Sequence, residues 1–336
     1  MMNFRAWLQF FRLHTAAAEI GGLGIAAYIA DIRGWMLLPV LLFAILWHAT
    51  GFGENSLLDW VHGYDRNDPG KAHHPLNTGT IKQAMATDVV ITMHILGIVY
   101  YAGMIFLYHT RAAAVGYSLV LFALAILFGN LYNFYGKLNK WAAAIEISLT
   151  FSLLTASVFA LTNGRFGVVP LLLFLYAFFY VFFQIAFAGE WKELGQVNER
   201  NILRQLRCSV GDDGRYRLSN AGRLFAAILT GIKLLILGQI VAYTYRPTRL
   251  FAPWLAVDAL ILIVLLSYLF AFLVAPTRRI GMMVMGAGEA LSYIILVPAI
   301  INVAQWPYVL LFILMPMGWF AIFNKVTWNT VLAPQV

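Results

Sequence analysis

Apolar segments long enough to cross a lipid bilayer recur along almost the whole length of this 336-residue chain. A helix rises about 1.5 Å per residue and the hydrocarbon core is about 30 Å thick, so a spanning helix needs roughly 20 apolar residues. Hydrophobic residues make up 61% of the sequence and charged residues only 11%, which is typical of membrane proteins with many spans. We therefore predict an all-α transmembrane bundle of nine to ten helices.

The predicted spans are, in order, residues 13–32, 35–58, 83–108, 113–133, 141–161, 167–189, 220–244, 250–274, 282–303 and 306–325. The count is nine if the almost continuously apolar stretch 282–325 forms one helix. The whole chain, 1–336, is predicted to be a single integral-membrane domain, because most connections are short and favour antiparallel neighbouring helices.

The basic residues predict the orientation in a cell membrane. With ten spans, most of the 23 lysines and arginines fall on the face that also holds both termini. The positive-inside rule places that face in the cytoplasm. The net charge of +8 therefore reports topology first and suits anionic lipid headgroups second. Binding to nucleic acid is not expected, because there is no soluble basic domain.

Two long polar connections stand out, at about 59–82 and about 190–219, and both fall on the predicted cytoplasmic face. In the first, Asn55 and Asp59 are four residues apart and share one face of a helix end, and Asp65 follows. In the second, Glu190 and Glu193 are three apart and also share a face. Carboxylate and amide oxygens of this kind suit Mg²⁺, which binds through one or two carboxylates and substrate phosphates. We predict these five residues as metal ligands.

Basic side chains in or near the two loops could hold phosphate oxygens. Together with Asn55, the predicted diphosphate-binding residues are Lys71, His74, Lys140, Lys192, Arg200 and Arg204. A polar loop at a helix end is usually only hydrated, but two such loops on one face, holding most of the acidic residues, favour a site. His14, His48, His94 and His109 match no zinc spacing and are expected to be packing or interfacial residues.

The first loop resembles a known motif. Its matching residues are Asn55, Asp59, Gly63, Asp65, His74, Pro75, Leu76 and Gly79. They are similar to the first aspartate-rich motif of the UbiA superfamily of intramembrane prenyltransferases, and the Gly-x-Asp spacing is closest to the menaquinone-type branch. The second loop occupies the place of the family's second motif, with Glu190, Glu193 and Glu199 in place of aspartates. Tyr132 and Lys137 resemble the family's Tyr/Lys pair between the fourth and fifth helices.

The resemblance implies a UbiA-like fold and Mg²⁺-dependent transfer of a prenyl group from a prenyl diphosphate to a lipophilic acceptor, either an aromatic quinone precursor or a lipid. It implies catalytic roles for Asp59, Asp65, Tyr132 and Lys137. The sequence departs from the family pattern at Ser56, where the motif has aspartate. It departs again in the glutamates of the second loop and in the extra predicted helix 306–325.

Two other classes of function stay open. The altered second motif is compatible with a non-catalytic relative that binds isoprenoids. A membrane transporter would also have many spans, although it would favour midplane charges and broken helices in equivalent places of two halves. Lys233 is the one clear midplane charge, and we predict that it pairs with Asp258 or Glu289 as a structural tie, because unpaired charges at that depth are costly.

Overall fold

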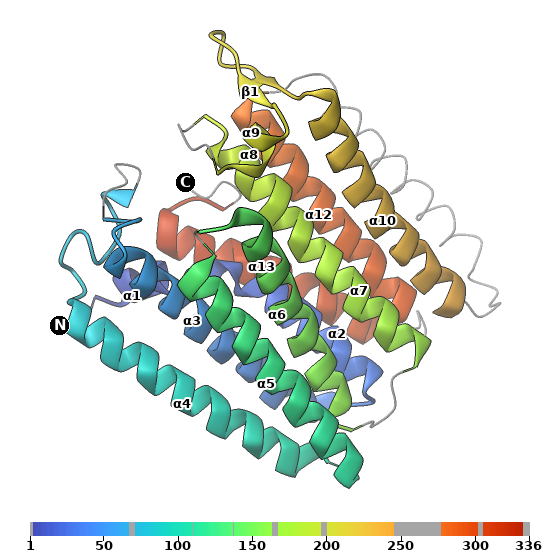
Figure 1. The fold of residues 1–336 in the computed structure, drawn as a ribbon. Helices are drawn as coiled ribbons and strands as arrows, with labels where there is room; N and C mark the ends of the chain where they lie inside the picture. Colours follow the sequence, from blue (N-terminus) through green and yellow to red (C-terminus); the bar gives the residue numbers. More distant parts are fainter. Residues whose placement is uncertain are drawn as a thin grey trace. The chain divides into compact units, whose positions relative to one another are not determined.

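The structure is a computed structural model that describes residues 3–66, 71–109, 111–136, 138–162, 167–195, 200–244, 277–301 and 305–331. Within these ranges the chain is almost entirely helical, and the strands that occur form one short antiparallel hairpin. The elements in chain order are α1 (Phe4–Phe10), η1 (Leu13–Ala16), α2 (Ala17–Ile29), η2 (Gly34–Met36), α3 (Leu37–Val61), α4 (Gln83–Tyr108), α5 (Ala112–Tyr135), α6 (Lys140–Ala160), α7 (Val168–Phe183), η4 (Gln184–Gly189), α8 (Glu190–Glu193), α9 (Ile202–Gln205), β1 (Ser209–Val210), β2 (Tyr216–Arg217), α10 (Asn220–Thr244), α12 (Arg278–Ile300) and α13 (Trp306–Trp328) (Figure 1). The predicted all-α, multi-span fold class is confirmed.

Eight helices in the described part of the chain are long and apolar enough to cross a membrane. They are Gly34–Val61, Gln83–Tyr108, Ala112–Tyr135, Lys140–Ala160, Val168–Glu193, Asn220–Tyr243, Arg278–Ile300 and Trp306–Trp328. Each matches a predicted span, and the apolar stretch 282–325 forms two helices, α12 and α13. The predicted span 250–274 lies outside the described residues. The protein is therefore a multi-pass membrane protein, while the cytoplasmic placement of its termini and loops stays a prediction.

The first predicted span, 13–32, is not among these eight helices and stays a prediction. Arg12, just before it, adopts a left-handed backbone conformation with φ of 47°. From Leu13 to Ile29 the chain is continuously helical, as the 3₁₀ turn of η1 followed directly by α2, and this stretch is slightly shorter than the roughly 20 residues of a typical span. Most of α2 is buried, and it packs against α3 and α13.

The chain divides into two compact units. The first contains residues 1–134, 153–166 and 306–336, and the second contains residues 135–152 and 167–305, so α6 contributes its two ends to different units. The prediction of one domain over 1–336 stays a prediction. In the first unit α3 packs against α2 and α4, and α13 packs against α2 and η1.

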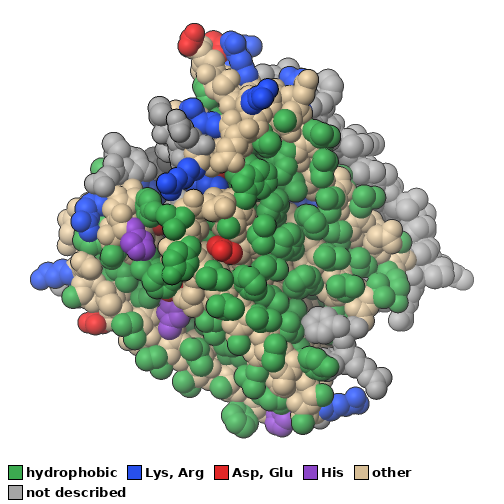
Figure 2. All heavy atoms as spheres, viewed as in Figure 1, with side chains coloured by type: hydrophobic (Ala, Val, Ile, Leu, Met, Phe, Trp, Pro, Cys, Tyr) green, Lys and Arg blue, Asp and Glu red, His purple; other side chains and the backbone are tan. Residues whose placement is uncertain are grey.

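Apolar side chains lie on the outer surface of α4 and α5 (Figure 2). Examples that are at least half exposed are Ile95, Val99, Phe106, Val120 and Leu127. Apolar surface of this extent is costly in water and favourable against lipid tails. These two helices therefore face lipid when the protein is in its bilayer.

The second unit is built on α7, α10 and α12, of which α10 contacts both of the others (Figure 1). Its core holds Trp191, which is fully buried, with Phe187, Leu203 and Tyr216 around it. Gly281 of α12 lets this indole approach, because a Cβ there would lie 2.3 Å from Trp191 Nε1. This packing anchors α8, which carries the second polar loop's carboxylates.

Lys233 of α10 forms an ion pair with Glu289 of α12, and both side chains are buried. The ammonium also lies 4.7 Å from the ring centroid of Phe183 and 5.6 Å from that of Tyr180. The predicted structural tie is confirmed for Glu289. The other predicted partner, Asp258, lies outside the described residues.

Candidate functional site

The first polar loop begins where α3 ends. Gly63 adopts a left-handed conformation with φ of +85°, and its N–H donates to the Trp60 carbonyl at 3.1 Å. Glycine is the residue that takes this conformation without steric cost, which makes it a common terminator of helices. The chain then turns back, so that the Asp65 N–H donates to the Asp59 carbonyl at 3.1 Å. This turn brings Asp65 beside the last turns of α3.

The predicted ligands of the first loop are buried. Asn55 and Asp59 lie on α3 at 6% and 3% exposure, and Asp65 is 5% exposed. Asp65 Oδ1 lies 3.9 Å from Lys71 Nζ, whereas its Oδ2 atom has no hydrogen-bond partner. A buried carboxylate oxygen without a partner is strongly unfavourable. It fits the electrostatic demand of a divalent cation, so Asp65 suits the predicted Mg²⁺.

In the described part of the chain, no three His, Cys, Asp or Glu side chains group closely enough to hold a metal ion by themselves. This agrees with the coordination habits of Mg²⁺, which keeps several waters and takes its remaining oxygens from one or two carboxylates and from substrate phosphates. The first loop offers two carboxylates and one amide, so it fits a cation that arrives with a diphosphate.

Asn77, which the sequence analysis did not single out, holds the first loop together. Its Nδ2 group donates to the carbonyls of Asp65 and Lys71 at 2.9 and 2.7 Å, and its Oδ1 atom accepts from Trp60 Nε1 at 2.9 Å. Asn77 therefore fixes the backbone on both sides of the loop. Its position inside the Pro-Leu-x-x-Gly segment was the available signal.

Ser56 explains one departure from the family motif. Its hydroxyl donates to the Phe10 carbonyl at 2.9 Å, and the side chain is fully buried. The residue thus ties α3 to α1. An aspartate at this position would place a charge against a carbonyl in the protein interior, which is costly.

His74, predicted to bind diphosphate, is buried at 6% exposure. Its Nδ1 atom accepts from the Leu76 N–H at 3.4 Å, which assigns the proton to Nε2, and Nε2 has no hydrogen-bond partner. Burial lowers the pKa of His74 to about 4, with the Asp65 carboxylate opposing the shift and Arg12 adding to it. At neutral pH His74 is therefore an uncharged N–H donor and not a cation.

This pKa predicts how stability depends on pH. The folded-state pKa of His74 lies below its ordinary 6.5, so the unfolded chain binds the proton more tightly. The contribution is fully present above pH 6.5 and is lost as pH falls toward 4, by about 3 kcal/mol in total. Thermal unfolding in detergent between pH 7.5 and 4.5 should show this loss in the wild type and a smaller loss in His74→Gln. His109→Gln, a change at an exposed histidine, is the control. A loss of stability in His74→Gln equal to that of the wild type would contradict the role of His74.

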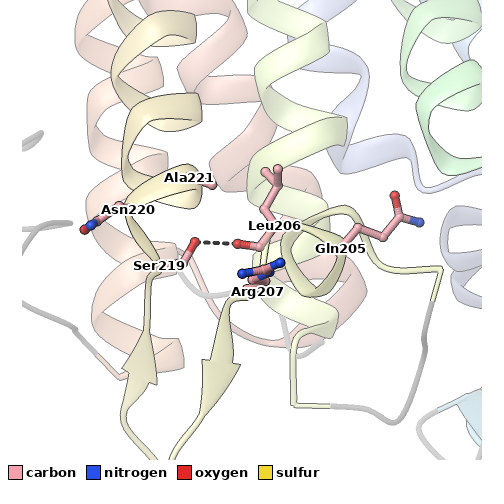
Figure 3. A pocket seen from close by; sticks show the side chains of 6 residues that line it. All are labelled: Gln205, Leu206, Arg207, Ser219, Asn220 and Ala221. Carbon is pink, nitrogen blue, oxygen red and sulfur yellow. Dashed lines mark hydrogen bonds between the residues drawn. The ribbon is translucent and has the colours of Figure 1, made fainter.

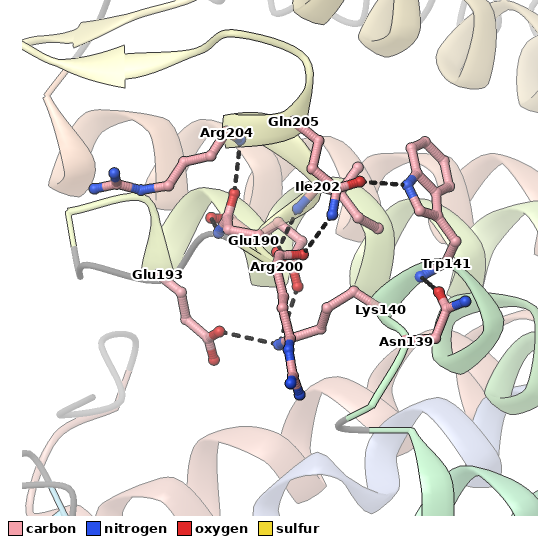
Figure 4. A network of polar contacts seen from close by, with 10 residues as sticks. Asn139, Lys140, Trp141, Glu190, Glu193, Arg200, Ile202, Arg204 and Gln205 are labelled. Atoms are coloured by element: carbon pink, nitrogen blue, oxygen red, sulfur yellow. Dashed lines mark hydrogen bonds and ion pairs between the residues drawn. The ribbon is translucent and has the colours of Figure 1, made fainter.

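The second polar loop starts where α7 passes through the π-helix η4 into α8. Glu190 and Glu193 both contact one lysine, which shows that they share a face, as predicted. Lys140 Nζ, from the first turn of α6, lies 3.2 Å from Glu190 Oε1 and 3.2 Å from Glu193 Oε2 (Figure 4). The second loop's carboxylates therefore surround an ammonium group of the chain itself.

Glu190 also shapes the loop. Its Oε2 atom accepts from the Ile202 N–H at 2.9 Å (Figure 4). Its backbone carbonyl accepts from Asn201 Nδ2 at 2.8 Å. Asn201 in turn caps α9 by accepting from the Arg204 N–H at 3.1 Å. Glu190 is thus buried at the start of α9, whereas the Glu193 side chain is 34% exposed.

The remaining predicted residues are placed as follows. Lys192 lies half-buried on α8, and Arg200 is exposed before α9. Arg204 donates to the Leu194 carbonyl at 3.0 Å, and Tyr132 is half-buried on α5. Lys137 and Glu199 lie outside the described residues. Lys140, Lys192, Arg200 and Arg204 therefore belong to the second unit with Glu190 and Glu193. Their roles toward a diphosphate stay predictions.

A polar cluster in the first unit escaped the sequence analysis. Glu54 Oε2 accepts from Asn133 Nδ2 at 2.6 Å and lies 3.6 Å from His94 Nε2, so that side chains from α3, α5 and α4 meet among apolar helices. His48 pairs in the same way with Glu19, at 2.6 Å. These two histidines bind carboxylates, beyond the packing role expected of them. A carboxylate inside each apolar span was the signal.

A pocket of about 300 Å³ lies elsewhere in the second unit (Figure 3). Its lining residues are Gln205, Leu206, Arg207, Ser219, Asn220 and Ala221. Ser219 donates to the Leu206 carbonyl across it and also accepts from the Gly222 N–H at 3.0 Å, which caps α10. The pocket contains no carboxylate and none of the predicted site residues, so it is separate from the candidate site.

Two solved structures share this fold, and one of them is a UbiA homolog. One is described as giving insight into the biosynthesis of digeranylgeranylglyceryl phosphate synthase in membranes. It is 19% identical, covers 91% of this chain and 100% of its own, and superposes with a TM-score of 0.61. The other is a UbiA homolog from Archaeoglobus fulgidus bound to DMAPP and Mg²⁺, with 17% identity, coverage of 88% and 98%, and a TM-score of 0.50.

No protein-family model matches the sequence, and no curated protein matches it. The likeness is therefore carried by the arrangement of the helices over nearly the whole of both chains. It confirms the UbiA-like fold that the first-loop motif implied.

Proposed function

We propose that this protein is a Mg²⁺-dependent prenyltransferase that moves a prenyl group from a prenyl diphosphate to a lipophilic acceptor within the membrane. The observation that carries the proposal is the buried Asp65 carboxylate, with an unpartnered oxygen, next to Asp59 at the end of a membrane helix. A UbiA homolog of the same fold is bound to DMAPP and Mg²⁺, which supports both the substrate class and the cation.

The first loop would bind the cation and one side of the diphosphate. Asn55, Asp59 and Asp65 would hold Mg²⁺, and the bound cation stabilises negative charge on the departing diphosphate. Lys71, whose Nζ atom lies 3.9 Å from Asp65, would contact a phosphate oxygen directly. His74 would donate its Nε2–H as a neutral group.

The basic side chains in and beside the second loop would bind phosphate oxygens. Lys140, Lys192, Arg200 and Arg204 offer charge-assisted hydrogen bonds to phosphate oxygens. Tyr132 and Lys137 keep the catalytic roles that the family resemblance implies.

Water must be kept from the allylic cation that forms when the diphosphate departs. Phe43, Trp47, Tyr101 and Phe122 form a buried aromatic block in the first unit, with ring centroids of Tyr101 and Phe122 only 3.9 Å apart. Phe43 and Trp47 lie on the same helix as Asn55 and Asp59, two to four turns earlier. Aromatic faces also stabilise positive charge. The acceptor is proposed as a class, either an aromatic quinone precursor or a lipid.

The proposal predicts a metal-dependent product. Purified protein in nanodiscs, given radiolabelled geranylgeranyl or farnesyl diphosphate and a lipid extract as acceptor source, should form a labelled lipid with Mg²⁺ and none with EDTA. Asp88→Asn, a change at an exposed carboxylate of α4, is the matched control and should keep full activity. Absence of both product and diphosphate binding would refute the proposal.

Mg²⁺-dependent binding of the diphosphate without product would instead identify a non-catalytic isoprenoid-binding relative. The engagement of Glu190 in the structure of its own loop favours this second candidate more than a transporter. A transporter is not proposed, because Lys233, the midplane charge that would mark a transport path, is paired with Glu289.

A further inference from the structure

Lys140 occupies the position that a metal ion would need at the second loop. Its ammonium nitrogen lies 3.2 Å from one oxygen of Glu190 and 3.2 Å from one oxygen of Glu193 (Figure 4). A cation shared by two carboxylates is also how a divalent metal binds a pair of acidic residues. Here the shared cation is the ammonium group of the Lys140 side chain.

The start of α6 holds Lys140 in this position. Asn139 caps the helix, its Oδ1 atom accepting from the N–H groups of Trp141 and Ala142 at 3.0 and 3.2 Å. The Trp141 indole N–H donates to Gln205 Oε1 at 2.9 Å, which links α6 to α9 (Figure 4). The Lys140 side chain is only 16% exposed. The contact between Lys140 and the two carboxylates is therefore largely buried, and these hydrogen bonds hold the helix end that carries Lys140 in place.

Glu190 has little capacity left for a metal. Its second oxygen accepts from the Ile202 N–H, and the side chain is 4% exposed. A Mg²⁺ ion at its usual distance of about 2.0–2.1 Å from these oxygens would stand within a few ångströms of the ammonium. Two cations that close repel each other strongly in a poorly solvated site. Glu190 and Glu193, which the sequence predicts as metal ligands, do not fit a metal while Lys140 is in place.

We propose that the Lys140 ammonium replaces a metal ion at the second loop, so that the chain takes up divalent cation only through the first loop. The inference depends on the proposed function for its substrate, a prenyl diphosphate. It concerns the number and place of the cations and not whether transfer occurs. The basic side chains in and beside the second loop then supply fixed positive charge, and their binding of phosphate needs no metal.

The test counts metal ions directly. Mn²⁺, a paramagnetic substitute for Mg²⁺, is titrated into nanodisc-embedded protein with a non-hydrolysable thiolodiphosphate analogue of DMAPP, and bound Mn²⁺ is measured by electron paramagnetic resonance. One tightly bound Mn²⁺ per chain is expected in wild type and in Glu193→Gln, and none in Asp65→Asn. Two in wild type, one of them lost in Glu193→Gln, would overturn the inference and leave the proposed function intact.

A second variant tests the lysine itself. In Lys140→Met the two carboxylates lose their ammonium, so the count should rise from one Mn²⁺ to two, and combining it with Glu193→Gln should return the count to one. A count that stays at one in Lys140→Met protein that elutes as a folded species overturns the role of Lys140. No bound Mn²⁺ in any variant, wild type included, would reject the proposed function together with this inference.

Discussion

Asp65→Asn is expected to lower kcat/KM for prenyl transfer by on the order of 10²–10³-fold, the usual effect of removing one charge-stabilising group at a reacting centre. The substitution nearly preserves the shape of the side chain, removes its charge and replaces one carboxylate oxygen with an NH₂ group. Asp65 Oδ2 is buried and has no hydrogen-bond partner, so no native hydrogen bond of that atom is lost. The deficit should therefore come from weaker cation binding.

The stability of this variant separates a binding role from a structural one. A buried carboxylate kept for its ligand is unfavourable in the ligand-free protein, so Asp65→Asn should unfold at the same temperature as wild type or higher. Steady-state kinetics over a range of Mg²⁺ concentrations should show that the variant needs more Mg²⁺. Asp88→Asn serves as the matched control. An Asp65→Asn protein that is fully active, or whose activity falls only as it unfolds, would show that Asp65 does not hold the cation.

The features that the sequence predicted are those set by local chemistry. A run of about 20 apolar residues indicates a membrane helix, so eight spans were predicted close to their observed bounds. Spacing along a helix is equally local, which is why Glu190 and Glu193 were expected to share a face before their common contact with Lys140 was known.

The features that escaped prediction depend on contacts between residues far apart in the chain. Lys140 and Glu193 are separated by 53 positions, and Ser56 and Phe10 by 46. No periodicity reports such pairs. For this reason Ser56 was recognised only as a departure from the family motif, whereas its hydroxyl ties two helices together. Lys140 was predicted to bind diphosphate, and its partnership with the two glutamates was not foreseen.

The first predicted span, 13–32, differs from its prediction in detail. Its helix begins at Leu13, directly after the left-handed Arg12, but its first turn is 3₁₀ and the helix ends at Ile29. The helix α2 packs against α3 and α13. Apolarity alone does not report such contacts between distant parts of the chain.

Lys233→Met should destabilise the protein by about 3–5 kcal/mol, the typical cost of removing one partner from a buried ion pair. Glu289 would remain at 5% exposure with its charge uncompensated, and its Oε2 atom already has no hydrogen-bond partner. The Phe183 ring, 4.7 Å from the ammonium, would contact methionine equally well. The loss should therefore come from the stranded carboxylate and not from packing.

The double variant Lys233→Met/Glu289→Gln isolates that cause. With both charges removed, most of the lost stability should return, because replacing a whole buried pair is often close to neutral. Reversible unfolding in mixed detergent micelles measures both proteins, and the coupling between the two substitutions is the quantity of interest. If the double variant is as unstable as Lys233→Met alone, the lysine stabilises α10 by its packing, and the ion pair is not the tie between α10 and α12. Recovery would show that a charge at the depth of a membrane helix centre serves here to hold two helices together.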